Sequence, residues 1–132
     1  MSGEQEVLSM VVEAALGRKA EDVAVLDLTA MGSITDHFVV CHGHSVRQTQ
    51  AIADAVQETL KQAGVRPGHI EGYPSGEWIL MDYGDFVVHV FTEEKRNHYQ
   101  LEKLWSDAPR LTLQTRPVTA RKGGRRGQEG EP

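Results

Sequence analysis

The sequence predicts an α/β domain in which a mixed β-sheet is flanked by helices. Three observations lead to this prediction: helical apolar patterns at about residues 4–19 and 45–63, a short apolar segment at residues 37–41, and a β-hairpin at residues 78–91. Apolar side chains that repeat with the period of a helix in some segments and of a strand in others predict helices that pack on a β-sheet. Such elements are expected to form a single layered domain. A chain of 132 residues is long enough for one domain with a modest core.

The first half of the chain supplies two helices and two strands. Residues 4–19 place apolar side chains on one helical face, and residues 23–28 alternate as in a β-strand. Residues 37–41 are apolar on both sides, which indicates a central strand. The second helix is predicted to begin after Ser45, in a Ser-x-x-Gln capping spacing, and to end before Gly64. Its predicted buried stripe comprises Val46, Thr49, Ile52, Ala53, Val56, Leu60 and Ala63.

The second half is dominated by the hairpin. Its two apolar strands are joined by the turn Asp82–Asp85, in which Gly84 supplies the positive φ that other residues resist. A short strand at residues 69–72 precedes the hairpin, and Thr92 is the predicted cap of a third helix. The charged segment 93–98 is expected to be a solvated face of that helix. The residues predicted to pack this helix back onto the domain are Tyr99, Leu101, Leu104 and Trp105.

Charge is distributed unevenly along the chain. Residues 1–109 hold 8 Lys and Arg against 17 Asp and Glu, a net charge of −9, whereas residues 110–132 hold 6 against 2, a net of +4. An acidic body disfavours direct docking on nucleic acid, because phosphates repel it, and favours a basic protein partner. Acidity that only maintains solubility is the alternative. We therefore predict a folded domain over residues 1–109 and a basic, Gly- and Arg-rich disordered tail over residues 110–132.

The compartment is predicted from what the sequence does not carry. No apolar run approaches the roughly 18 residues of a membrane span, and the acidic N-terminal segment does not have the pattern of a signal or transit peptide. The single cysteine, Cys41, cannot form an internal disulfide and is expected to be a small buried side chain. These features favour the cytoplasm.

Three separated motifs carry a family resemblance. Ser33–Cys41 reads SITDHFVVC, Gly43–Thr49 reads GHSVRQT, and Glu77–Phe91 reads EWILMDYGDFVVHVF, followed by YQLEKLW at Tyr99–Trp105. In this order, and from about residue 6 to residue 107, the chain resembles the ribosomal silencing factor family (RsfS, also called Iojap-like). The resemblance implies a mixed sheet flanked by helices, with a topology related to that of nucleotidyltransferases.

The resemblance also implies a function. Members of this family are expected to be non-enzymatic translational repressors without a cofactor, and to bind the large-subunit protein uL14 (L14). A domain bound there would block the joining of the ribosomal subunits. The family is often homodimeric, so self-association is expected as well. The basic tail lies outside the resemblance, and it is either a solvated appendage or a weak, salt-sensitive contact with ribosomal RNA.

The hairpin carries the predicted partner-binding residues. Alternation along its first strand places Trp78 and Leu80 on one face, and Ile79 and Met81 on the other. Periodicity alone leaves open whether Trp78 belongs to the core or to a contact surface, and the resemblance favours the contact surface. The full set of predicted partner-binding residues is Glu77, Trp78, Leu80, Asp82, Tyr83 and Asp85.

The alternative function is that of a small nucleotide-binding or nucleotidyltransferase-type enzyme. The segment Gly43–Ser45 could imitate the Gly-Ser turn of such enzymes, but no Asp-x-Asp or Asp-x-Glu pair lies on a predicted strand to hold Mg²⁺. Asp82 and Asp85 lie across a turn instead. The pair His42 and His44 has no matching Cys/His cluster, so no metal site is predicted.

Overall fold

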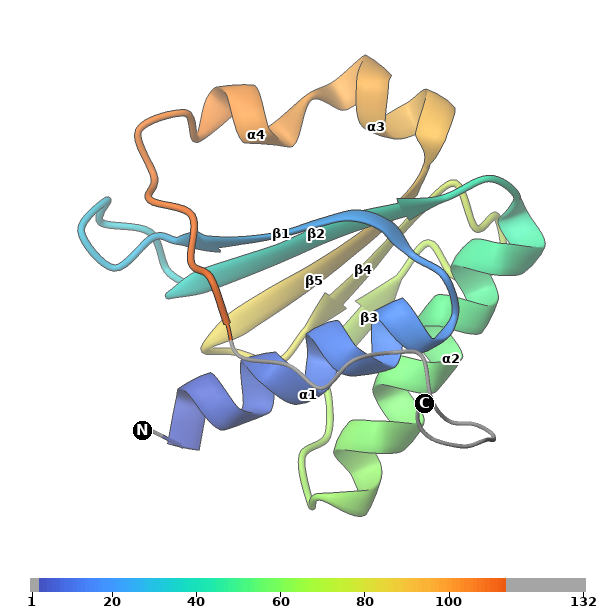
Figure 1. Ribbon diagram of the computed structural model, residues 1–132, viewed down its shortest axis with the longest axis horizontal. Helices are drawn as coiled ribbons and strands as arrows, with labels where there is room; N and C mark the ends of the chain where they lie inside the picture. The colour runs from blue at the N-terminus through green and yellow to red at the C-terminus, as the bar shows by residue number, and fades with distance from the viewer. Residues whose placement is uncertain (1–2, 114–132) are drawn as a thin grey trace, which may run out of the picture.

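A five-stranded mixed sheet with helices on both faces forms the domain, as the computed structural model shows for the described residues 3–113 (Figure 1). The predicted α/β fold class is confirmed. No helix in this range is both long and apolar enough to cross a membrane. The elements are α1 (Gly3–Gly17), β1 (Glu21–Asp27), β2 (His37–Gly43), α2 (Val46–Gln62), β3 (His69–Glu71), β4 (Trp78–Asp82), β5 (Phe86–Thr92), α3 (Glu93–Tyr99) and α4 (Leu101–Leu104).

The strand order is β1-β2-β5-β4-β3, and β2 and β5 are parallel whereas the other pairs are antiparallel. The strand predicted at residues 37–41 is therefore central, as expected. The outer edge of β1 is paired by the returning chain, since the amide of Asp27 donates to the carbonyl of Pro109 at 2.8 Å and that of Leu111 donates to Val25 at 2.8 Å. The chain thus stays attached to the sheet beyond Pro109. Residues 114–132, most of the predicted disordered tail, lie outside the described residues.

Helices α1 and α2 cover one face of the sheet, which we call the inner face (Figure 1). The side chains of Ile79 and Met81 on β4 are fully buried against them. Cys41 belongs to the same cluster, and burial raises the pKa of its thiol to about 12, so it is the predicted small core residue. The helix side chains that complete this core are Leu8, Val11, Val12, Ala15, Ile52, Ala53, Val56 and Leu60.

Local capping residues set the helix limits. The Ser45 hydroxyl accepts from the amide of Gln48 at 3.1 Å, which confirms the predicted cap of α2. The Gln48 side chain returns to the amide of His44 at 2.7 Å, one residue earlier than in a capping box. Gly64 follows α2 at φ +82°, and the Thr92 hydroxyl caps α3 by accepting from the amide of Lys95 at 3.3 Å.

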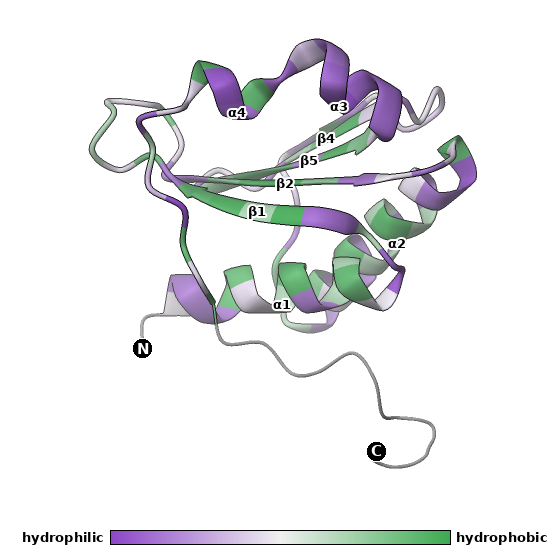
Figure 2. Cartoon of the chain, turned by 45° about the horizontal axis from the view of Figure 1, so that its top comes forward, coloured by the Kyte–Doolittle hydropathy of each residue, from purple (hydrophilic) through white to green (hydrophobic). Residues whose placement is uncertain are grey.

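The opposite, outer face of the sheet is covered by α3 and α4, which are short and mostly hydrophilic (Figure 2). Gln100 has φ +50° and divides the predicted third helix into α3 and α4, so the four residues predicted to pack it onto the domain do not lie on one continuous helix. Trp105 packs edge-on against Phe38 at a ring separation of 5.8 Å, as predicted. The predicted packing of Leu104 is wrong, because the break at Gln100 leaves its side chain 76% exposed.

A buried cation attaches this layer to the sheet. Arg96 was expected on a solvated face but is only 8% exposed. Its guanidinium forms an ion pair with Glu102, and donates to the Glu21 carbonyl at 3.3 Å and to Nδ1 of His42 at 3.0 Å. Burial is tolerated because these acceptors replace the lost water. The expectation of a solvated face therefore fails at this position.

Candidate partner-binding surface

The β4–β5 hairpin distributes the predicted site residues over both faces of the sheet. Trp78, Leu80 and Asp82 alternate with the fully buried inner residues of β4, so they belong to the outer face. The turn that follows is the predicted one, since Gly84 has φ +88°. Its amide donates to the Asp82 carboxylate at 2.8 Å, which fixes that carboxylate at the beginning of the turn.

A cavity of about 400 Å³ opens on the outer face beside this turn, and we call it the outer hollow. Its described lining comes from β2, β4, β5 and two loops, and no residue of α3 or α4 is among it. Leu80 and Asp82 lie in this lining, and Ile34 at the rim is completely exposed. The lining residues are Ser33, Ile34, Thr35, Phe38, Leu80, Asp82, Gly84, Val87 and His89.

Hydrogen bonds hold the two loops of the outer hollow together. The buried hydroxyl of Thr35 donates to the carbonyl of Gly84 at 3.0 Å. The amides of Asp36 and His37 both donate to the carbonyl of Asp85, at 2.9 and 3.3 Å. The hollow is therefore built on strands and on a turn that hydrogen bonds hold in place. A rigid lining of this kind is typical of a preformed binding surface. The Asp85 side chain is exposed beside it.

Trp78 lies next to the outer hollow in a packed aromatic cluster. Its Nε1 donates to Nδ1 of His89 at 3.1 Å, and its ring stacks on Phe91 with centroids 5.0 Å apart. Tyr99 of α3 covers it at 4.6 Å and is itself 44% exposed. Trp78 is thus neither a fully buried core residue nor a fully exposed contact residue. Its half-buried indole packs within the aromatic cluster of the outer face and stays partly accessible at the surface.

His89 completes this cluster, and the sequence prediction did not include it. The residue is 4% exposed on β5, and its desolvation lowers the pKa of the imidazole to about 4. Its Nε2 is buried and has no hydrogen-bond partner among the described residues. The signal that could have drawn attention to it is a lone ionisable residue within the apolar run Phe86–Phe91.

Tyr83 lies apart from the other predicted residues. Its ring stacks on Phe86 at 4.9 Å and packs against the inner core, so it does not share a face with Trp78. Burial raises the pKa of its phenol to about 12, and in the part of the chain that the structure describes its buried hydroxyl has no hydrogen-bond partner. Glu77 is exposed at the other end of β4, with its carboxylate 3.9 Å from Nζ of Lys95.

In the turn Gly43–Ser45, which was compared with that of nucleotidyltransferases, the side chains of His44 and Ser45 make contacts within the domain. The Ser45 hydroxyl caps α2, and His44 lies between two carboxylates, 2.7 Å from Glu21 and 3.3 Å from Glu93. The hydrogen bond that His44 donates to the Glu21 carboxylate, and the charge of that carboxylate, raise the pKa of His44. Within residues 3–113, no group of three or more His, Cys, Asp or Glu side chains is placed to hold a metal ion.

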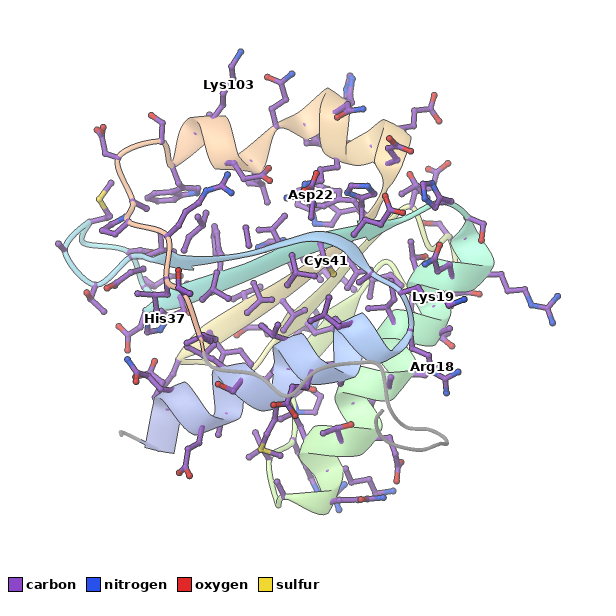
Figure 3. All side chains as sticks on the ribbon, viewed as in Figure 1. Arg18, Lys19, Asp22, His37, Cys41 and Lys103 are labelled. Carbon is purple, nitrogen blue, oxygen red and sulfur yellow. The ribbon has the colours of Figure 1, made fainter. Side chains whose placement is uncertain are left out.

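A second, polar cavity of about 380 Å³ lies under α3 and α4. Arg96 lines it, but its guanidinium is already committed to Glu102, His42 and a backbone carbonyl. In Figure 3, Asp22 lies between β1 and α3, while Lys103 points away from the sheet. This cavity therefore belongs to the charged contact between the α3–α4 layer and the sheet. The outer hollow, which combines apolar walls with a carboxylate, is the better candidate for binding a partner.

Comparison with known proteins identifies the family. The family described as "Ribosomal silencing factor during starvation" matches residues 2–131, a longer region than residues 6–107. The ribosomal silencing factor RsfS of Halalkalibacterium halodurans is 43% identical over 110 residues, 83% of this chain and 94% of the relative. The Bacillus subtilis protein of that name is 39% identical over 83% of this chain and 93% of its own.

A solved structure from Chromobacterium violaceum has 38% sequence identity and a TM-score of 0.76, and the match covers 86% of this chain and 92% of that one. The enzyme alternative is excluded, since RsfS is a family of non-enzymatic ribosome silencing factors. The fold, three ordered motifs and the matching relatives agree, and the chain therefore belongs to the ribosomal silencing factor family, RsfS.

Proposed function

We propose that this protein represses translation by binding the large-subunit protein uL14 (L14) and blocking the joining of the ribosomal subunits. The observation that carries the proposal is the outer hollow, an apolar surface bordered by the acidic Asp82–Asp85 turn. The matched relatives are named as ribosomal silencing factors, which supports the ribosome as the target. The proposed place of action is the cytoplasm.

The chemistry of the outer hollow suits a basic protein. Leu80, Phe38 and Val87 give it apolar walls, and the fully exposed Ile34 can enter a complementary depression on the partner. The net charge of −9 over residues 1–109 attracts a basic surface from a distance. Apolar contact would then slow dissociation, and charge would speed association and select the partner.

The mechanism is steric. A folded domain seated on the subunit-joining side of the large subunit occupies space that the small subunit needs, so no catalytic group is required. Such a repressor acts stoichiometrically and reversibly. Subunit joining should therefore fall in proportion to the occupancy of the large subunit, and it should recover when the protein is diluted or washed away.

Sedimentation with isolated subunits tests the proposal. The protein is expected to co-migrate with large subunits and not with small ones, and to bind purified L14. Replacing Asp82 and Asp85 by Asn should slow association, and the effect should shrink at high salt. Glu58→Gln, an exposed neutralisation on α2, is the matched control. Co-migration with small subunits, or no binding to L14, would contradict the proposal.

We also propose that the free protein forms a homodimer that uses part of the same surface. An apolar hollow with an exposed Ile34 is the kind of patch that self-association covers. If the two uses share residues, L14 must compete with the dimer. Analytical ultracentrifugation with increasing L14 should then show dimer converting to a one-to-one complex. A dimer that binds L14 without dissociating would place the dimer interface elsewhere.

A further inference from the structure

The protonation of His89 follows from its one hydrogen bond. Trp78 Nε1 can only donate, so Nδ1 of His89, 3.1 Å away, must be the acceptor. Desolvation holds the pKa of His89 at about 4, so the ring is neutral at physiological pH. A neutral imidazole carries one proton, and with Nδ1 accepting, that proton is on Nε2. Trp78 thus fixes the tautomer of His89.

The Nε2–H of His89 is consequently a buried donor that finds no hydrogen-bond acceptor within residues 3–113. Leaving such a group unpaired is unfavourable, and an unpaired buried polar group in a native structure calls for an explanation. Phe38, the nearest ring, lies edge-on with its centroid 4.6 Å from that of His89, and a ring face is a weak acceptor at best. Both residues line the outer hollow.

Two further groups of the outer hollow surround this donor. Leu80 is paired directly with His89 across the β4–β5 ladder and is half-buried, so a change of its rotamer can admit an atom beside the imidazole. Asp82 is the next residue of β4 on the outer face after Leu80, and it is paired with Val87 of β5. Diagonal neighbours of this kind have backbone positions roughly 7 Å apart, which is about the length of two residues of an extended bound segment.

We propose that the Nε2–H of His89 is a recognition donor of the outer hollow, and that it binds an oxygen acceptor on a segment of a basic protein whose neighbouring Lys or Arg pairs with Asp82. The acidic turn and the net charge of −9 over residues 1–109 select a basic segment. The buried donor requires that an oxygen of the segment, from its backbone or a side chain, be placed beside Nε2, because Nε2 would otherwise stay unpaired in the complex. This inference rests on the proposed function and specifies how L14 is recognised.

Nitrogen-15 NMR of the histidine rings in the wild-type protein tests the inference. In the free protein, His89 should show a protonated Nε2 and an unprotonated Nδ1. Addition of purified L14 should move the Nε2–H proton downfield and slow its exchange with solvent, as a new hydrogen bond does. A protonated Nδ1 in the free protein would refute the tautomer. Binding that leaves the Nε2–H resonance unchanged would overturn the inference and spare the proposed function.

A pair of variants gives an independent readout. His89→Phe keeps an aromatic ring but removes the donor, and it should weaken binding to L14 about tenfold or more. His98→Phe, on the exposed surface of α3 and outside the outer hollow, is the matched control and should bind as the wild type does. The melting temperature of His89→Phe should stay within about 5 °C, because one unpaired donor replaces another.

The outcomes separate the two proposals. Wild-type affinity in a folded His89→Phe variant would overturn the recognition donor while L14 binding stands. Failure of the wild-type protein itself to bind L14 would overturn the proposed function, and the recognition donor with it. If His89→Phe does not fold, the NMR measurement on the wild-type protein decides the question.

Discussion

The two faces of the sheet are built differently although the same strands form both. On the inner face, Ile79 and Met81 are fully buried beneath long amphipathic helices. On the outer face, the intervening Trp78 and Leu80 are half-buried, and the covering helices are short and interrupted at Gln100. The inner face is a continuous apolar core, whereas the outer face mixes aromatic rings, a buried ion pair and the outer hollow.

This difference shows how a small domain can keep its core on one face of a sheet and leave the other face partly open. Because side chains alternate along a strand, successive residues of β4 lie either in the inner core or on the half-buried outer face, so neighbours in sequence can be changed independently. The incomplete helical cover of the outer face leaves room for a partner. It also makes that face the one where polar groups, protonation and truncation should have measurable effects.

The largest effect is expected from truncating neighbouring residues on opposite faces. Ile79→Ala removes a fully buried side chain from the inner core and should lower the free energy of unfolding by about 3–4 kcal/mol. Leu80→Ala should cost about 1 kcal/mol or less, because its side chain is already half-exposed, but it should weaken L14 binding. Urea denaturation and an L14 titration measure the two quantities. Equal losses of stability would mean that the faces are not independent.

Acid should destabilise the outer face through His89. Its pKa is about 4 in the folded protein and about 6.5 when unfolded, so the unfolded chain binds more protons between these values. Stability is therefore complete above pH 6.5 and falls as the pH decreases towards 4, by on the order of 3 kcal/mol. Denaturation curves from pH 7 to 4.5 measure this slope. His89→Phe should flatten it, and an unchanged slope would assign the acid sensitivity to other groups.

An intermediate effect is expected at the edge of β1. Leu111 and Leu113 pack against the inner core, and the Leu111 amide pairs with Val25. Truncation after Pro109 should therefore lower stability by about 1–2 kcal/mol, whereas truncation after Leu113 removes none of these contacts. Thermal melts of the two variants test this. L14 binding should survive both, and its loss on the shorter truncation would extend the recognition surface to this segment.

The strands, caps and turns could be predicted from the sequence because their signals are local. Ser45 caps a helix through the next few residues, and Gly84 has the positive φ that its turn requires. The alternation that separates Trp78 from Ile79 is also local, and it was read correctly. Extending it by two positions would have placed Tyr83 on the inner face with Ile79 and Met81.

The remaining features depend on contacts between distant segments. Arg96 is buried where the carbonyl of Glu21 on β1 and the ring of its paired residue His42 on β2 both accept from the guanidinium. No spacing rule connects residues so far apart in sequence, so a charged helix segment reads as a solvated face. His89 is not predicted as a site residue for the same reason, since only the fold shows that Trp78 occupies one of its nitrogens while the other has no partner in the described range 3–113.

The smallest effect should come from His44, at the exposed edge of the outer layer. Hydrogen bonding and charge from Glu21 raise its pKa, and the same hydrogen bond lowers the pKa of Glu21. The His44 contribution is complete below its ordinary pKa of 6.5 and is lost as the pH rises through the higher folded value. The Glu21 contribution is complete above 4.5 and is lost as the pH falls. The pair is therefore most favourable between these values.

His44→Gln tests this exposed pair against the buried His89. The difference in melting temperature between wild type and His44→Gln should be greatest near pH 5.5 and should shrink towards pH 8, and added salt should reduce it, because exposed ion pairs are screened. The two histidines thus act with opposite sign over the same pH range. A difference that is constant from pH 5.5 to 8 would show that His44 contributes only by packing, and the titration of His44 would then play no part in the pH dependence of the outer face.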